Sequence, residues 1–156
     1  MSEQALETVH RVYEAFNERD IGRLLECLDP DFEIDRTDDL AYAAALLRVL
    51  GPRFVILSGG YRGHDEVRRL FETVWEISEW FRVTPAQYLE IDGLVLVPLV
   101  LSARAKESGE QGEAQTTHLW TVRDAKATRL RVFADEATAR EVAQRELAAR
   151  DGRERR

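Results

Sequence analysis

Apolar residues recur at helical spacing in the first segment of the chain, residues 5–18. They fall on one face of a helix while most of the glutamates fall on other faces, which predicts an amphipathic first helix. A second short helix is predicted after Asp20, whose carboxylate can cap its first turn. The Asp29-Pro30 pair is expected to end it, because proline disfavours helical geometry in the preceding residue. The apolar positions of the first helix are Leu6, Val9, Val12, Tyr13 and Phe16.

The middle of the chain carries another long stretch of helical periodicity, over residues 63–77. Its first turn holds Asp65 and Glu66, where the positive end of the helix dipole favours acidic side chains. The spacing predicts the longest helix of the chain. Its apolar stripe consists of Val67, Leu70, Phe71, Val74, Trp75 and Ile77.

Segments with strand-like patterns flank this helix. Residues 32–35 alternate apolar and acidic side chains before it, and four more strands are expected after it, separated by turns such as Asp92-Gly93. Asp135 can cap a final helix that reaches about Ala149. Helices followed by a run of antiparallel strands predict an α+β domain. The four strands are expected over residues 81–91, 94–106, 112–123 and 128–133.

Length and composition fit one domain. The chain has 156 residues, 44% of them hydrophobic, which suffices for one substantial core. We expect a single domain over residues 1–150 and a short frayed tail over residues 151–156. No apolar run approaches the ~20 residues needed to span a bilayer, and the polar N-terminus lacks the features of a secretory signal. We therefore expect no membrane partner and a cytoplasmic location.

Charge and metal-ligand residues exclude other classes of function. The net charge is −7, and residues 1–40 contain twelve Asp or Glu and four Arg, a local net charge of −8. Nucleic acid is not an expected partner, because phosphate contacts need a basic patch. Cys27 is the only cysteine, and none of the three histidines has a metal-ligand spacing to a second histidine or to the cysteine. No metal and no cofactor are predicted.

Four short signatures follow one another along the chain: Tyr13-x-x-Phe16-Asn17-x-x-Asp20, Asp29-Pro30-Asp31-Phe32-Glu33, Tyr61-Arg62-Gly63 and His118-Leu119-Trp120. In this order they resemble the SnoaL-like branch of the nuclear transport factor 2-like superfamily, over roughly residues 5–143. The resemblance depends on the combination, since each signature alone is weak.

The resemblance implies a cone-shaped cup, in which a curved, mostly antiparallel mixed sheet wraps around the N-terminal helices and a helix follows at the C-terminus. The fold serves isomerases, cyclases, epoxide hydrolases, dehydratases and non-catalytic binders. It therefore implies a pocket for a small hydrophobic molecule and pairing of two chains as a homodimer. Any catalysis would be of a type that needs no cofactor.

The segment of residues 38–60 departs from the family pattern and is expected to be an insertion. Leu40, Ala44, Leu47 and Leu50 fall on one helical face, and Gly51-Pro52 is a strong stop signal. An apolar, strand-like run follows at residues 54–57. Two interpretations stay open, namely added core or dimer surface, and a lid over the mouth of the cup.

Three residues are candidates for catalysis. In ketosteroid isomerases of this superfamily, a tyrosine on the first helix with an asparagine downstream donates a hydrogen bond to a developing oxyanion, and Tyr13 with Asn17 resembles that pair. His118 falls near the position where those enzymes carry a protonated carboxylic acid, and histidine can exchange a proton near neutral pH. Asp35 lies near the expected cup mouth, one residue before their catalytic base. Each also has an ordinary interpretation, as core or as a solvated acid.

Other catalytic schemes fit the sequence less well. The position of the essential aspartate of the cyclases is Val132 here. An epoxide hydrolase needs an Asp-Arg-Asp constellation, for which Asp35, Arg131 and Asp135 supply the residue types. The hypotheses that remain are a pocket with general acid and base chemistry, a non-catalytic binding module, and an interaction protein with a filled cup. The residues expected to line the pocket are Phe16, Phe71, Trp75, Trp120 and Arg131.

Overall fold

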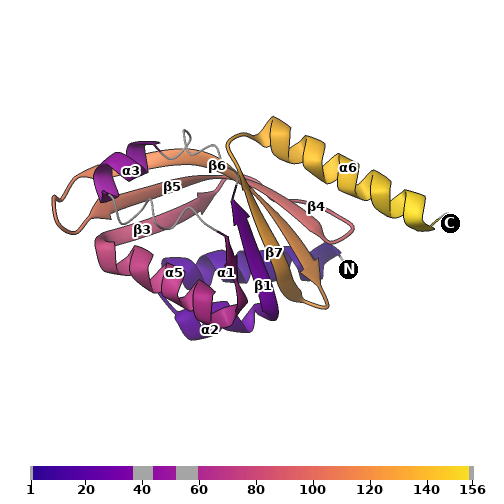
Figure 1. Ribbon diagram of the computed structural model, residues 1–156, viewed down its shortest axis with the longest axis horizontal. Coiled ribbons are helices and arrows are strands. Elements are labelled where there is room, and N and C mark those ends of the chain that lie inside the picture. The colour runs from indigo at the N-terminus through magenta and orange to yellow at the C-terminus, as the bar shows by residue number, and fades with distance from the viewer. Residues whose placement is uncertain (1, 37–43, 52–59, 155–156) are drawn as a thin grey trace.

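A curved sheet with helices on both faces forms the protein, as the computed structural model shows for residues 2–36, 44–51 and 60–154 (Figure 1). Three helices cover one face: α1 (Ser2–Asn17), α2 (Ile21–Glu26) and α5 (Gly63–Ile77). Helix α6 (Glu136–Glu154) lies against the opposite face. In the described part of the chain, no helix is both long and apolar enough to cross a membrane.

The sheet is mixed. Its strand order is β2-β1-β7-β6-β5-β3, with β4 paired to β5, and only the β1–β7 pair is parallel among the described strands. This arrangement confirms the predicted α+β class and the mostly antiparallel mixed sheet. The strands are β1 (Leu28–Arg36), β2 (Tyr61–Arg62), β3 (Ser78–Pro85), β4 (Leu89–Ile91), β5 (Leu94–Ala105), β6 (Gln111–Arg123) and β7 (Lys126–Phe133).

Both faces of the sheet are apolar at its centre. Neighbouring residues along a strand contribute to opposite faces, because side chains alternate in direction. On β6, His118 and Trp120 face the helices α1 and α5, while Leu119 faces α6. The inner face forms the large core with those helices, and the outer face forms a smaller apolar cluster with α6. The outer cluster consists of Leu94, Leu96, Leu119, Phe133 and Ala139.

Several predicted boundaries are confirmed. Asp20 accepts a hydrogen bond from the Arg23 amide at the start of α2, and Asp135 accepts one from the Thr138 amide at the start of α6. Helix α6 continues to Glu154 rather than ending near Ala149, and it is longer than α5, which corrects the prediction that α5 is the longest helix.

Helix α3 (Ala44–Leu50) lies in the predicted insertion. It buries Leu46, Val49 and Leu50 in the large core, and the Gly51 amide donates to the Leu47 carbonyl at its end. Gly112 on β6 permits this packing, since a Cβ there would lie 2.9 Å from Val49 Cγ2. Leu40 and the predicted strand-like run of residues 54–57 lie outside the described residues.

Asn17 attaches the end of α1 to the sheet. Its amide donates to the Val83 carbonyl on β3 and accepts from the Val83 amide, both at 2.9 Å. The neighbouring Arg19, with φ of 56°, donates to the carbonyl groups of Trp75, Ser78 and Glu79 where α5 passes into β3. The asparagine of the first signature therefore holds the helix that carries Tyr13 against the sheet.

Replacing Asn17 should destabilise this junction. Asn17→Ala removes both hydrogen bonds to Val83, so we expect the free energy of unfolding in urea to fall by about 1–3 kcal/mol. Asn17→Asp should also destabilise, because a carboxylate oxygen would face the Val83 carbonyl. The exposed Gln87→Ala is the control, with a change within about 0.5 kcal/mol expected. An Asn17→Ala protein as stable as the control would contradict this role.

Candidate functional site

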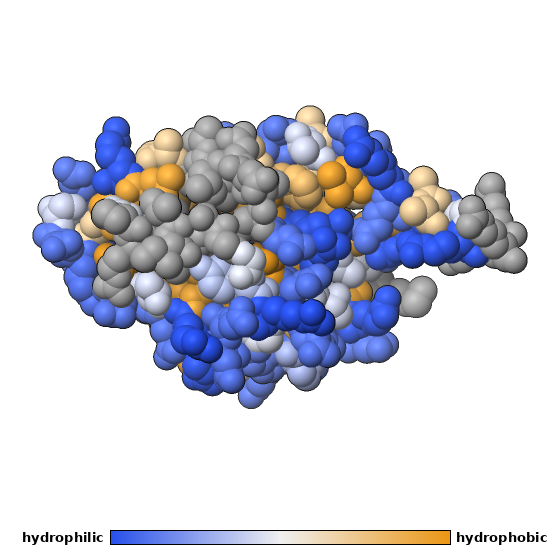
Figure 2. Space-filling model, viewed as in Figure 1, coloured by the Kyte–Doolittle hydropathy of each residue, from blue (hydrophilic) through white to orange (hydrophobic). Residues whose placement is uncertain are grey.

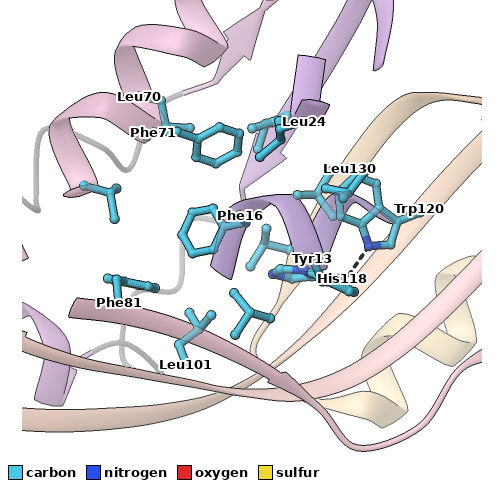
Figure 3. Close-up of a pocket in the computed structure, with 15 residues that line it drawn as sticks. Tyr13, Phe16, Leu24, Leu70, Phe71, Phe81, Leu101, His118, Trp120 and Leu130 are labelled. Atoms are coloured by element: carbon cyan, nitrogen blue, oxygen red, sulfur yellow. Dashed lines mark hydrogen bonds between the residues drawn. The ribbon is translucent and has the colours of Figure 1, made fainter. Parts of the chain in front are cut away.

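A cavity of about 90 Å³ lies between α1, α5 and the inner face of the sheet (Figure 3). Most of its wall is aliphatic or phenyl, and three lining side chains carry polar atoms: Tyr13, His118 and Trp120. Figure 3 shows these three together at one side and Phe16, Phe71 and Phe81 at the other. The remaining lining residues are Val12, Leu24, Ile34, Leu70, Val74, Val83, Leu101, Leu130 and Val132.

The polar side of this pocket is a chain of buried hydrogen bonds. Trp120 Nε1 lies 2.7 Å from Tyr13 Oη, which lies 2.9 Å from His118 Nδ1. The rings also pack, since those of Tyr13 and His118 are stacked with centroids 5.8 Å apart, and those of Tyr13 and Trp120 meet edge to face at 5.7 Å. All three side chains are at most 8% exposed. These hydrogen bonds join Tyr13 to residues that lie 105 and 107 positions further along the sequence.

The donor and acceptor properties of the three groups give these hydrogen bonds a direction. An indole N–H can only donate, so Trp120 donates to the Tyr13 oxygen. The Tyr13 hydroxyl proton can then be donated to His118 Nδ1, which makes the neutral imidazole the tautomer protonated at Nε2. Hydrogen bonds are therefore donated from Trp120 to Tyr13 and from Tyr13 to His118.

Tyr13 stays protonated in this setting. Burial raises the pKa of the Tyr13 phenol well above 10.0, although the hydrogen bond from Trp120 acts in the opposite direction. The phenol is therefore a hydrogen-bonding group in the pocket throughout the neutral and mildly alkaline range.

The apolar side of the pocket is an aromatic cluster around Phe16. Its ring meets Phe71 and Phe81 edge to face, with centroids 5.4 and 5.7 Å apart. Trp75, which was expected to line the pocket, packs against Phe16 and Phe71 at 5.6 and 6.2 Å but is not among the lining residues. It supports the wall from behind.

Asp35 does not join Tyr13 and His118. Its neighbour Ile34 lines the pocket, so the alternation of β1 turns Asp35 to the outer face. There it accepts from Arg129 Nε at 2.9 Å and from Nη2 at 2.5 Å, and its side chain is 45% exposed. Of the three residues named as candidates for catalysis, Tyr13 and His118 thus share one cavity and Asp35 does not.

Arg131 also faces outward. On β7 the pocket side is taken by Leu130 and Val132, while Arg131 pairs with Glu146 of α6 at 2.7 Å. The guanidinium is therefore part of the contact between α6 and the sheet, which corrects its expected place in the pocket. Asp135 caps α6, so the constellation of Asp35, Arg131 and Asp135 is not assembled around the pocket.

Several lining residues were not expected from the sequence, among them Leu24, Phe81, Leu101 and Leu130. Each lies in a pattern that predicts burial, but burial alone does not distinguish the core from a pocket wall. Strand parity relative to Trp120 could have found Leu130, because the two residues are paired across β6 and β7 and so share a face.

A second hollow, of about 170 Å³, lies on the outer face between α6 and the sheet. Its floor includes Leu94, Leu96 and Leu119, and Leu147 of α6 borders it. Figure 2 shows apolar surface beside the start of α6, while the rest of this view is mostly hydrophilic. This hollow shares no lining residue with the inner pocket.

The inner pocket can hold an apolar molecule and give it polar contacts at one end. Among the described residues that line it, none carries a carboxylate, and His118 carries the only imidazole. The described residues also contain no group of three His, Cys, Asp or Glu side chains placed to hold a metal ion.

Comparisons with known proteins agree with this fold. The model of the SnoaL-like domain matches residues 9–130. No curated protein matches the chain in sequence. TerC, co-crystallized with polyporic acid, has a similar structure, with 24% identity, a TM-score of 0.67, and coverage of 88% of this chain and 96% of TerC.

Two further solved structures show the same likeness of fold. A nuclear transport factor 2-like protein of unknown function from Burkholderia pseudomallei K96243 is 24% identical, with a TM-score of 0.67 over 87% of this chain and 94% of that chain. A candidate SnoaL-like polyketide cyclase from Jannaschia sp. CCS1 is 15% identical, with a TM-score of 0.65 over 86% and 87%. From the match over residues 9–130, the chain belongs to the SnoaL-like domain family, and its fold is similar to that of nuclear transport factor 2-like proteins.

Proposed function

We propose that this protein binds a small, mainly apolar organic molecule in the inner pocket. The observation that carries the proposal is the pocket itself, an apolar cavity with one buried polar end formed by Tyr13, His118 and Trp120. Such a combination of an apolar wall with a few convergent polar groups is typical of ligand sites. TerC, a protein of similar fold, was co-crystallized with polyporic acid, which supports this choice.

The size of the cavity limits the ligand. At about 90 Å³ it is smaller than an engineered apolar cavity of about 150 Å³ that holds benzene. A ring-sized ligand would therefore have to displace part of the wall. Phe71 is only partly buried and is the lining aromatic best placed to turn aside.

Binding is the function that the lining chemistry supports best. Among the described lining residues, an isomerase-like proton abstraction would have His118 as its base, since Tyr13 stays protonated and no carboxylate faces the cavity. In the assigned tautomer Nδ1 of His118 accepts from Tyr13 and Nε2 carries the proton, so His118 would act as a base only after Nδ1 gives up this hydrogen bond. Acid and base chemistry through His118 is the second candidate function.

Ligand binding is tested with benzene, phenol and cyclohexanone. Two measurements report it, namely the heat of binding by calorimetry and the shift in melting temperature. We expect a ring compound with a polar group to bind saturably and to raise the melting temperature with concentration. Tyr13→Phe removes a hydroxyl at the polar end, so it should weaken phenol by roughly three- to tenfold while affecting benzene little. The outward-facing Asp35→Asn is the control and should leave all affinities unchanged.

Two outcomes would contradict the binding proposal. One is that none of the three compounds binds to the wild type or to Phe71→Ala, in which the wall is opened. The other is that Asp35→Asn weakens binding as much as Tyr13→Phe, which would locate the ligand on the outer face. Conversion of one of these compounds to a product by the wild type, lost in His118→Ala, would instead support acid and base catalysis as the function.

The buried Tyr13 phenol should make stability depend on alkaline pH. The pKa of Tyr13 in the folded chain lies well above 10.0, so above pH ~10 the unfolded chain releases this proton while the folded chain retains it. The free energy of unfolding then falls as pH rises from about 10 towards the folded pKa. In Tyr13→Phe this fall should be less steep, as measured by urea unfolding between pH 8 and 11.

At neutral pH the same Tyr13→Phe variant should be about 1–3 kcal/mol less stable, because the Trp120 N–H and His118 Nδ1 both lose a buried partner. The loss of stability at neutral pH reports the hydrogen bonds of the Tyr13 hydroxyl, and the alkaline slope reports its ionisation. Equal alkaline slopes for the wild type and Tyr13→Phe would show that Tyr13 ionises as an exposed tyrosine does.

Pairing of two chains through the outer face is the remaining part of the proposal. Ile91 is 58% exposed and borders the hollow under α6, and an apolar surface of this kind favours a partner. Light scattering should give twice the mass of one chain, and Ile91→Glu should return the monomer. A wild-type monomer at high micromolar concentration would contradict the pairing.

A further inference from the structure

A surface groove of about 250 Å³ lies on the far side of Tyr13 from the inner pocket. Helix α1 forms one wall, and the connection between β3 and β4 forms the other. Tyr13 lines both spaces, so its ring is the partition between them. The groove is lined by His10, Tyr13, Glu14, Asn17, Glu18, Pro85 and Tyr88.

Three aromatic rings border this groove at steep angles to one another. The ring of Tyr88 lies 6.2 Å from that of His10, at an interplanar angle of 63°, and 6.2 Å from that of Tyr13, at 57°. Rings at such angles do not stack as flat pairs, and all three rings line the groove. Aromatic faces carry partial negative charge and attract cations within about 6 Å of the ring centre.

Two carboxylates complete the lining. Arg23 reaches both from outside the groove, with Nη2 3.0 Å from Glu14 and Nη1 2.6 Å from Glu18. Glu14 also lies 3.5 Å from Nε2 of His10, while the one positive charge of Arg23 is shared between the two carboxylates. Residues 2–20, which include α1, are also acidic, with five Asp or Glu and two Arg and hence a net charge of −3, which favours the approach of a cation.

We propose that this groove binds a small organic ammonium ion, of the trimethylammonium type. Aromatic faces beside carboxylates suit a cation whose charge is spread over methyl groups, whereas a metal ion would need several oxygen ligands at short distance. The two carboxylates would repel the phosphate of a choline lipid headgroup, so the ligand is a free ammonium ion rather than a membrane surface. The groove is separate from the inner pocket, and this proposal does not depend on the proposed function.

The probe is choline, and its neutral isostere 3,3-dimethylbutan-1-ol is the matched control. Both are titrated into the ¹⁵N-labelled full chain at pH 8, where histidine is ordinarily neutral and does not supply a competing charge. Choline should shift the amide signals of α1 and of residues 86–88 saturably, and added salt should weaken it. The isostere should produce no saturable shift there.

Variants of Tyr88 distinguish binding of choline by the aromatic ring face from contact with an apolar side chain. Tyr88→Leu should weaken choline by about two- to fivefold, while Tyr88→Phe, which keeps the ring face, should not. Glu14→Gln should weaken choline as well, and the outward Asp35→Asn, on another face, should not. Melting temperatures of these variants close to that of the wild type would show that the fold is intact.

The proposal is overturned if choline produces no saturable shift, if the isostere binds as tightly as choline, or if Tyr88→Leu and Glu14→Gln both bind choline like the wild type. Co-sedimentation of the chain with phosphatidylcholine vesicles would overturn the assignment to a free ion.

Discussion

The site depends on the buried hydrogen-bond chain from Trp120 through Tyr13 to His118. It joins the first helix to a central strand of the sheet, at a place where all three side chains are buried. A buried donor or acceptor that loses its partner costs more than the bond itself contributes. The position of α1 over the sheet, and hence the width of the pocket, therefore follows from satisfying three polar groups together.

The end of α1 is held by a different kind of contact. Asn17 bonds the Val83 backbone as a neighbouring strand would, and Arg19 gathers the carbonyl groups where α5 passes into β3. With the helix held along its length, the aromatic cluster around Phe16 can remain a wall instead of collapsing into the cavity. The signature Tyr13-x-x-Phe16-Asn17 thus combines a polar end, an apolar wall and an attachment.

The alternation of the sheet divides the remaining chemistry between two faces. Ile34, Leu130 and Val132 face the pocket, so the charged residues between them face outward. Asp35 and Arg131 accordingly form surface and α6 contacts with Arg129 and Glu146. An acidic strand end near a pocket is thus no indication of a catalytic base until the facing direction of the strand is known.

The sequence by itself determined the helices α1, α2 and α5, the long strands, the caps at Asp20 and Asp135, and the family, because these follow from periodicity and local hydrogen bonding. It also nominated Tyr13, His118 and Trp120. Only the tertiary structure decided that these three meet, since their hydrogen bonds span more than a hundred residues. It alone turned Asp35 outward, because the direction that a strand faces is set by the core against which it packs and not by its own pattern.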